Sequence, residues 1–171
     1  MLAYVFVVIA IAIRFLPHPF HFTPVGAALL FFGAHRSKRE MAIPVALLVL
    51  SDLLLNRFVY NIPLHADQIV VWAWYAGAIA IGMLLRKHLS APRVAGASVA
   101  ASISFYLVSN FAVWASYEMY PKTWQGMLAC YAAAVPFFRN TVVGDLIFSA
   151  VFFSVPFAIA ALRHEDKIAT I

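Results

Sequence analysis

The chain has 171 residues, of which 64% are hydrophobic, 15% aromatic and only 11% charged. A soluble domain carries about 25% charged residues, so this composition leaves too little polar surface to cover a globule in water. It excludes a soluble enzyme, a disulfide-stabilised secreted domain and a disordered chain, and it indicates one integral membrane domain over residues 1–171.

Six apolar runs follow one another along the chain, and each predicts a membrane-spanning helix. They cover residues 1–16, 25–34, 41–60, 69–85, 94–116 and 141–162. A helix needs about 20 residues to cross a bilayer, and fewer where the membrane is locally thin. Pro17, Pro19 and Pro24 separate the first run from the second. The first run lacks the basic start and the cleavage site of a signal peptide, so we expect a retained helix.

The stretch 126–162 is too long for one span and short for two. Pro136 and the pair Arg139-Asn140 interrupt it. Because a proline removes one helix hydrogen bond, we predict a short helix or re-entrant segment over 126–135 and a full span over 141–162. The predicted fold is an all-α membrane bundle of six transmembrane helices, with this short segment before the last one.

Basic residues concentrate in alternate loops, which predicts the orientation of the bundle. Eight of the 12 Lys and Arg residues belong to one set of loops: Arg36, Lys38, Arg39, Arg86, Lys87, Arg93, Arg163 and Lys167. The other four belong to the opposite set: Arg14, Arg57, Lys122 and Arg139. By the positive-inside rule, the first set and both termini are cytoplasmic, in a bacterial inner membrane. The net charge of +5 is then an orientation signal rather than a sign of nucleic-acid binding.

Tryptophans and small residues add two further expectations. The four tryptophans, Trp72, Trp74, Trp114 and Trp124, fall near the outer side of the membrane, as in an aromatic belt. Small residues recur at intervals of four on the fifth span (94–116) and on the fourth (69–85). Such spacing lets helices approach closely. It fits packing within the bundle or docking onto another subunit.

Five polar residues lie inside or at the ends of the apolar runs: Arg14, Asp52, Asn110, Arg139 and Asp145. A charge in the hydrocarbon region costs at least about 2.5–3.5 kcal/mol and usually faces a cavity or a partner. At about 1.5 Å per helical residue, all five fall in the outer half of the bundle. We expect Asp52 or Asp145 to pair with Arg14 or Arg139.

The polar cluster has two interpretations that the sequence leaves open. It lines a pocket open to the outside, or it is an ion-pair network that fixes how the helices pack. Asp52 is the deepest of the five and most needs a partner, so we interpret it as a structural ion-pair residue. Exchanging the two charges of a true pair restores a protein that either single change damages.

Motifs for enzymatic chemistry are absent from the sequence. It has no glycine-rich phosphate loop with a lysine, no nucleophile elbow and no zinc-protease motif. His18 and His21 supply two imidazoles, fewer than the three or four ligands of a zinc site. Cys130 lies among small residues, as a packing cysteine does. We therefore expect no enzyme, no metal and no resident cofactor.

Two blocks of residues carry a resemblance to a family of small, largely uncharacterised bacterial membrane proteins. The first block contains Arg14, Pro17-His18-Pro19, Phe22-Thr23-Pro24-Val25-Gly26-Ala27-Ala28 and Gly33-Ala34. The second contains Asn110-Phe111, Trp114, Tyr120, Thr123, Gly126, Cys130-Tyr131, Pro136-Phe137-Phe138, Asn140-Thr141 and Gly144-Asp145. That family is similar to the substrate-binding S components of energy-coupling-factor vitamin transporters, and the resemblance covers nearly the whole chain.

The resemblance implies a protein that binds a vitamin or a metal-related molecule from outside, under the outer loops. S components then turn over within the membrane on a transmembrane coupling subunit that two ATPases drive. We therefore expect uptake of a small molecule through an outward-facing pocket, with such a partner or alone. The expected lining is Arg14, Asn110, Trp114, Arg139, Asn140 and Asp145, with His18 and Thr23 on a lid. The alternative is a non-transport membrane scaffold, similar in size to a rod-shape morphogenesis subunit.

Overall fold

The computed structural model describes residues 1–16 and 22–168, and this part of the chain is helical without strands. Its six α-helices are α1 (Leu2–Arg14), α2 (Val25–His35), α3 (Ala42–Leu54), α4 (Asp67–Met83), α5 (Ala91–Ser116) and α6 (Trp124–Ile168). A short 3₁₀ helix, Lys38–Glu40, precedes α3, and a π-helix, η2 (Leu55–Tyr60), continues it. The predicted all-α class is confirmed.

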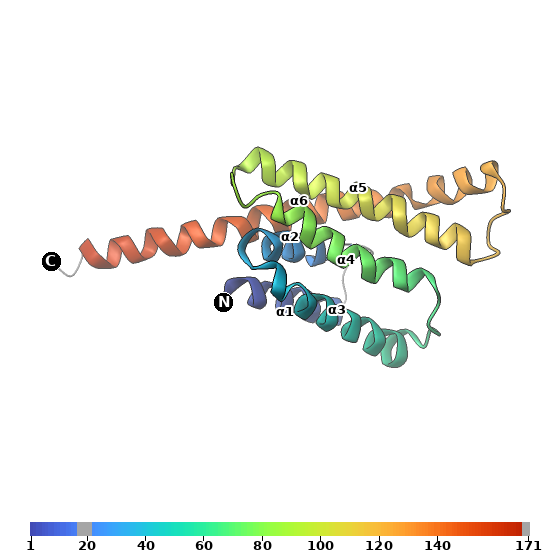
Figure 1. The fold of residues 1–171 in the computed structure, drawn as a ribbon, viewed down its shortest axis with the longest axis horizontal. Coiled ribbons are helices and arrows are strands. Elements are labelled where there is room, and N and C mark those ends of the chain that lie inside the picture. Colours follow the sequence, from blue (N-terminus) through green and yellow to red (C-terminus); the bar gives the residue numbers. More distant parts are fainter. Residues whose placement is uncertain (17–21, 169–171) are drawn as a thin grey trace.

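Successive helices run in opposite directions, so the loops alternate between two ends of the bundle (Figure 1). The loops 36–41 and 84–90 lie at the end that holds the N-terminus, and we call it the basic end. The loops 61–66 and 117–123 lie at the opposite end, which we call the cavity end. The sequence-based division of the loops into two sets therefore corresponds to two real ends of the molecule.

Helix α2 forms the centre of the bundle. Residues 25–33 are all buried, and α1, α4, α5 and α6 pack around them. A helix that is apolar on all sides is expected in such a position. Glycines bring α2 and α4 close together, because a Cβ atom on Gly33 would lie 2.1 Å from the Ile79 carbonyl oxygen and one on Gly82 would lie 2.3 Å from that of Leu30. The buried small residues of α4, Ala78 and Gly82, thus serve packing within the bundle.

The last helix corrects one prediction. α6 is a continuous helix of 45 residues that contains both Pro136 and Pro156, so the predicted break at Pro136 is wrong. A proline is tolerated in a membrane helix where neighbouring groups satisfy the backbone. Here the Tyr106 hydroxyl donates to the Tyr131 carbonyl at 2.7 Å, and the Tyr131 hydroxyl donates to the Leu107 carbonyl at 2.6 Å. These bonds hold α6 against α5 just before the proline.

Three helical segments of the described chain are long and apolar enough to cross a membrane: Lys38–Tyr60, Ala91–Ser116 and Trp124–Leu162. α1 and α2 are apolar but shorter. The C-terminal part of α6 extends beyond the other helices at the basic end (Figure 1). These features indicate a membrane protein.

Candidate binding site

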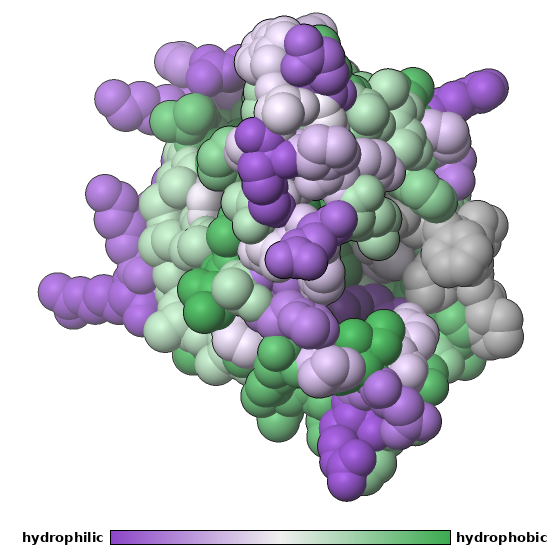
Figure 2. Space-filling view, turned by 90° about the vertical axis from the view of Figure 1, so that its right-hand side faces the viewer, coloured by the Kyte–Doolittle hydropathy of each residue, from purple (hydrophilic) through white to green (hydrophobic). Residues whose placement is uncertain are grey.

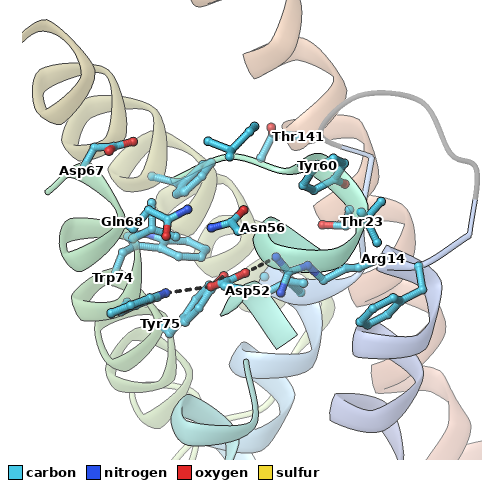
Figure 3. Close-up of a pocket in the computed structure, with 18 of the residues that line it drawn as sticks. Arg14, Thr23, Asp52, Asn56, Tyr60, Asp67, Gln68, Trp74, Tyr75 and Thr141 are labelled. Atoms are coloured by element: carbon cyan, nitrogen blue, oxygen red, sulfur yellow. Dashed lines mark hydrogen bonds and ion pairs between the residues drawn. The ribbon is translucent and has the colours of Figure 1, made fainter. Parts of the chain in front are cut away.

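A cavity of about 820 Å³ lies at the cavity end, and every α-helix and η2 contribute to its lining. Figure 2 shows this end face-on, with hydrophilic residues gathered around a hollow. Figure 3 shows the polar side chains that meet inside it. The lining includes Arg14, Phe15, Thr23, Gly26, Asp52, Asn56, Tyr60, Asp67, Gln68, Trp72, Trp74, Tyr75, Phe105, Thr141 and Asp145.

Arg14 and Asp52 form an ion pair among these polar side chains (Figure 3). Arg14 is the last residue of α1 and also donates to the Ser51 hydroxyl at 2.7 Å. The second carboxylate oxygen of Asp52 accepts from the Trp72 indole at 2.9 Å and from the Tyr75 hydroxyl at 3.0 Å. Asp52 is 7% exposed. A buried carboxylate requires such partners, and here both of its oxygens have them.

The π-helix η2 extends the wall that Asp52 begins. Asn56 and Tyr60 follow Asp52 at intervals of four residues and line the same cavity. The segment ends at Asn61, which has a left-handed backbone with φ 52°, and the Asn56 carbonyl accepts from the Ile62 amide at 3.0 Å. π-helical turns are often found at functional sites. This one turns the chain from α3 into the loop at the mouth of the cavity.

Two amide groups in the wall have atoms without a hydrogen-bond partner among the described residues. They are the side-chain nitrogen of Asn56 and the side-chain oxygen of Gln68, and both atoms are shielded from solvent. Nearly all buried polar atoms in proteins are paired. The cavity wall therefore holds one amide donor and one amide acceptor that the described chain leaves unpaired.

Asp145 contributes a second buried carboxylate, from the side of α6. It is 3% exposed, and it accepts from the Ser102 hydroxyl of α5 at 2.7 Å. A Cβ atom on Gly26 would lie 2.4 Å from one of its oxygens, so the site requires a glycine there. Thr141, one turn earlier on α6, lines the cavity as well.

At the mouth of the cavity, the loop before α4 meets the end of α5. The Tyr117 hydroxyl donates to the Asp67 carboxylate at 3.1 Å, and the His65 ring lies 5.1 Å from that of Tyr117. Burial, and then the hydrogen bond to Asp67, raise the pKa of Tyr117 above its ordinary value. The phenol therefore stays protonated and keeps donating to Asp67 at neutral pH.

Four of the residues that the sequence singled out meet in this cavity: Arg14, Thr23, Asp52 and Asp145. Of the ion pairs that the sequence allowed, Arg14–Asp52 forms. Asp145 has no arginine or lysine partner in the described part of the chain, whose ion pairs are Arg14–Asp52 and Arg36–Glu40. His18, which was expected on a lid, lies outside the described residues.

Asn110 and Trp114 were expected in the pocket, but neither lines it. The Asn110 side chain donates to the Tyr106 carbonyl of its own helix at 2.8 Å. The Trp114 indole donates to the Pro121 carbonyl at 2.9 Å, which ties the end of α5 to the following loop. Phe105 is the α5 residue that reaches the cavity.

Arg139 and Asn140 also lie away from the cavity lining. Arg139 is exposed. Because α6 is one unbroken helix, its cavity-facing positions are fixed by helical spacing. Thr141 and Asp145 occupy that face, four residues apart, and the two residues before Thr141 do not.

Most of the α4 residues that line the cavity were not predicted from the sequence. Gln68, Val71, Trp72 and Tyr75 line the cavity at the spacing of one helical face, a pattern that could have revealed them. Trp72 and Trp74 were expected in an interfacial belt. In the structure, Trp72 donates to Asp52, and Trp74 donates to the Ser104 hydroxyl at 3.0 Å.

The described residues contain no group of three or more His, Cys, Asp or Glu side chains that could hold a metal ion. The polar groups present can orient an organic molecule by hydrogen bonds and charge. A search of curated proteins finds no match to the chain. A family model matches residues 1–167, so the chain belongs to DUF6580, a family of unknown function.

Proposed function

We propose that this protein is a membrane-embedded binding protein that takes up a small molecule through the cavity. The observation that carries the proposal is the cavity of about 820 Å³ with an amide donor on Asn56 and an amide acceptor on Gln68 that lack partners among the described residues. Ligand sites are typically concavities of about 300–1,000 Å³ with a few convergent polar groups. The rings of Trp72, Trp74 and Phe105 supply the apolar remainder of the wall.

The proposed orientation places the cavity on the outer side of a bacterial inner membrane. Six helices cross the bilayer, and both termini are cytoplasmic. The support is the charge of the loops, since the basic end carries Arg36, Lys38, Arg39, Arg86, Lys87 and Arg93, and such loops stay in the cytoplasm. The cavity opens at the opposite end.

Transport inward follows the scheme that the S-component resemblance suggests. The loops close over the ligand, and a partner that prefers the loaded state moves the equilibrium forward. Part of the resemblance falls at the cavity itself: Thr23 and Gly26, from the Thr-Pro-Val-Gly-Ala-Ala motif, both line it. The partner we propose is a transmembrane coupling subunit with ATPases.

A pair of asparagines allows a matched test. The protein and its Asn56→Ala and Asn110→Ala variants are purified in mild detergent, and bound molecules are extracted and identified by mass spectrometry. We expect Asn56→Ala to lower ligand content about tenfold, because a ligand group loses its buried hydrogen-bond partner. Asn110→Ala, whose side chain bonds within α5, should retain the ligand. Absence of any stoichiometric molecule, or equal loss in both variants, would contradict the proposal.

A scaffold is the second candidate, and one observation favours it. Gly77 on α4 and Gly96 on α5 are exposed, and a Cβ atom on either would meet nothing within 4 Å. Exposed glycines let another membrane helix approach closely. If the protein is a scaffold, Gly77→Leu and Gly96→Leu should dissociate a co-purifying membrane partner, while Asn56→Ala should have no effect on it.

A further inference from the structure

The charges that line the cavity do not balance. Three carboxylates, of Asp52, Asp67 and Asp145, face one guanidinium, that of Arg14, among the described lining residues. Arg14 is bound to Asp52 and to the Ser51 hydroxyl. The one positive charge of the wall is thus already paired with Asp52. The carboxylates of Asp67 and Asp145 have no cationic partner in the described chain.

Of these two carboxylates, Asp145 is the more costly to leave without a partner, because it is only 3% exposed. Ser102 donates one hydrogen bond to it, and the first turn of α2 approaches it at Gly26. The N-terminus of a helix carries only about half of a positive charge. These contacts offset part of the carboxylate charge. A buried carboxyl group in a membrane protein either takes up a proton or pairs with a positive group, and a cationic ligand would supply the positive group here.

The cavity is also lined by aromatic rings and by an amide nitrogen without a hydrogen-bond partner in the described chain. Trp72, Trp74 and Phe105 line it together with Asp145, and aromatic faces attract organic cations within about 6 Å of the ring centre. Asn56 is 9% exposed, points into the cavity (Figure 3), and has a side-chain nitrogen without a partner in the described chain. That nitrogen donates, so the ligand should also carry an oxygen or another acceptor.

We infer that the ligand is an organic cation, whose ammonium or other positively charged group lies beside Asp145 and the aromatic wall while an acceptor group reaches Asn56. The inference rests on the proposed function and specifies the class of molecule that the cavity takes. A ligand whose main charged group is a carboxylate or a phosphate is the opposite outcome. It would have to share Arg14 with Asp52 and approach Asp145 with a like charge.

The test measures which charged probes enter the cavity. Trp114→Phe and Trp124→Phe leave Trp72 and Trp74, the two tryptophans of the lining, as fluorophores. Their fluorescence in the full-length purified protein is quenched with N-methylpyridinium as a cation, iodide as an anion and acrylamide as a neutral probe. The same background then receives Asp145→Asn, Asp67→Asn or Glu118→Gln. Glu118 is an exposed carboxylate in the loop 117–123 that does not line the cavity.

We expect N-methylpyridinium to quench more strongly than iodide. Asp145→Asn should lower the quenching constant of the cation roughly tenfold, the low end of the enrichment that a cleft of one charge sign gives its counter-ions. Asp67→Asn should lower it less, and it serves alone if Asp145→Asn does not fold. Glu118→Gln should change nothing, and acrylamide quenching should stay constant throughout.

Equal quenching by iodide, or an unchanged cation constant in both aspartate variants, would overturn the inference and leave the cavity itself intact. Failure of acrylamide to reach Trp72 and Trp74 has a different meaning. It would show that the cavity does not admit small molecules, and it would overturn the proposed function together with the inference.

Discussion

The basic end and the cavity end of the bundle each hold an arginine–carboxylate ion pair, but they surround it differently. At the basic end, Arg36 pairs with Glu40, four residues later, and the Tyr4 hydroxyl donates to the same carboxylate. Arg86 donates to the carbonyl of Gly33 at 2.8 Å and to that of Arg36. Arg36, Glu40 and Arg86 thus have their partners within the protein at this end.

At the cavity end, Arg14 and Asp52 come from different helices. α2 and α4 touch at Gly33 and Gly82 towards the basic end, whereas larger side chains line an open space at the other end. The same two helices are therefore in close contact at one end and held apart at the other. A one-sided opening of this kind suits a binding protein that loads from one face of a membrane.

Removing the carboxylate of the Arg14–Asp52 pair should have the largest effect on stability. Asp52→Ala leaves Arg14, Trp72 and Tyr75 without their shared acceptor. Breaking a buried pair in this way costs about 3–5 kcal/mol. We expect a large drop in the thermal unfolding temperature in detergent.

The basic end supplies the control for that measurement. Glu40→Ala removes the carboxylate of the more exposed pair, and its effect should be much smaller. The double variant Arg14→Met/Asp52→Met removes both buried charges and should recover part of the loss, since an apolar replacement of a buried pair is often tolerated. Equal losses in Asp52→Ala and Glu40→Ala would show that the two ends do not differ in the way described.

Inserting a methyl group into the close contact between α2 and α4 should have the next largest effect on stability. Gly33→Ala places a methyl group 2.1 Å from the Ile79 carbonyl oxygen, and overpacking of this kind costs about 1–3 kcal/mol. Gly77→Ala is the control, because its Cβ atom meets nothing within 4 Å. An exposed helical glycine replaced by alanine gains about 0.5–1 kcal/mol. A lower unfolding temperature for Gly33→Ala and a higher one for Gly77→Ala would support the close packing of α2 against α4. Similar shifts in the two variants would contradict it.

Part of this fold follows from the sequence by simple physics. The cost of charges in the bilayer predicts an arginine–aspartate pair, and Arg14–Asp52 is such a pair. The alternation of basic loops predicts two unlike ends. The prediction fails at Pro136, because a proline is expected to interrupt a helix, whereas α6 continues through it and is held against α5 by Tyr106 and Tyr131.

The site was harder to predict than the helices. The sequence gives the depth of a residue along its helix, and by depth both Asn56 and Asn110 fall in the outer half. Whether a residue lines the cavity or packs against a neighbour depends instead on the side of the helix from which its side chain projects. Asn56 was not among the predicted site residues, although it follows Asp52 by four residues and lines the same cavity. The direction of Asn110 depends on how α5 is rotated against α6, which local sequence does not encode.

The central claim is that the cavity opens on the side of the membrane opposite the basic loops. It is tested most directly by thiol labelling of sealed spheroplasts in a Cys130→Ser background, with Gln68→Cys in the cavity wall and Lys87→Cys in a basic loop. We predict that a membrane-impermeant maleimide labels the cysteine at position 68 in sealed cells and the one at position 87 only after permeabilisation. Labelling of position 87 but not of position 68 in sealed cells would contradict the account.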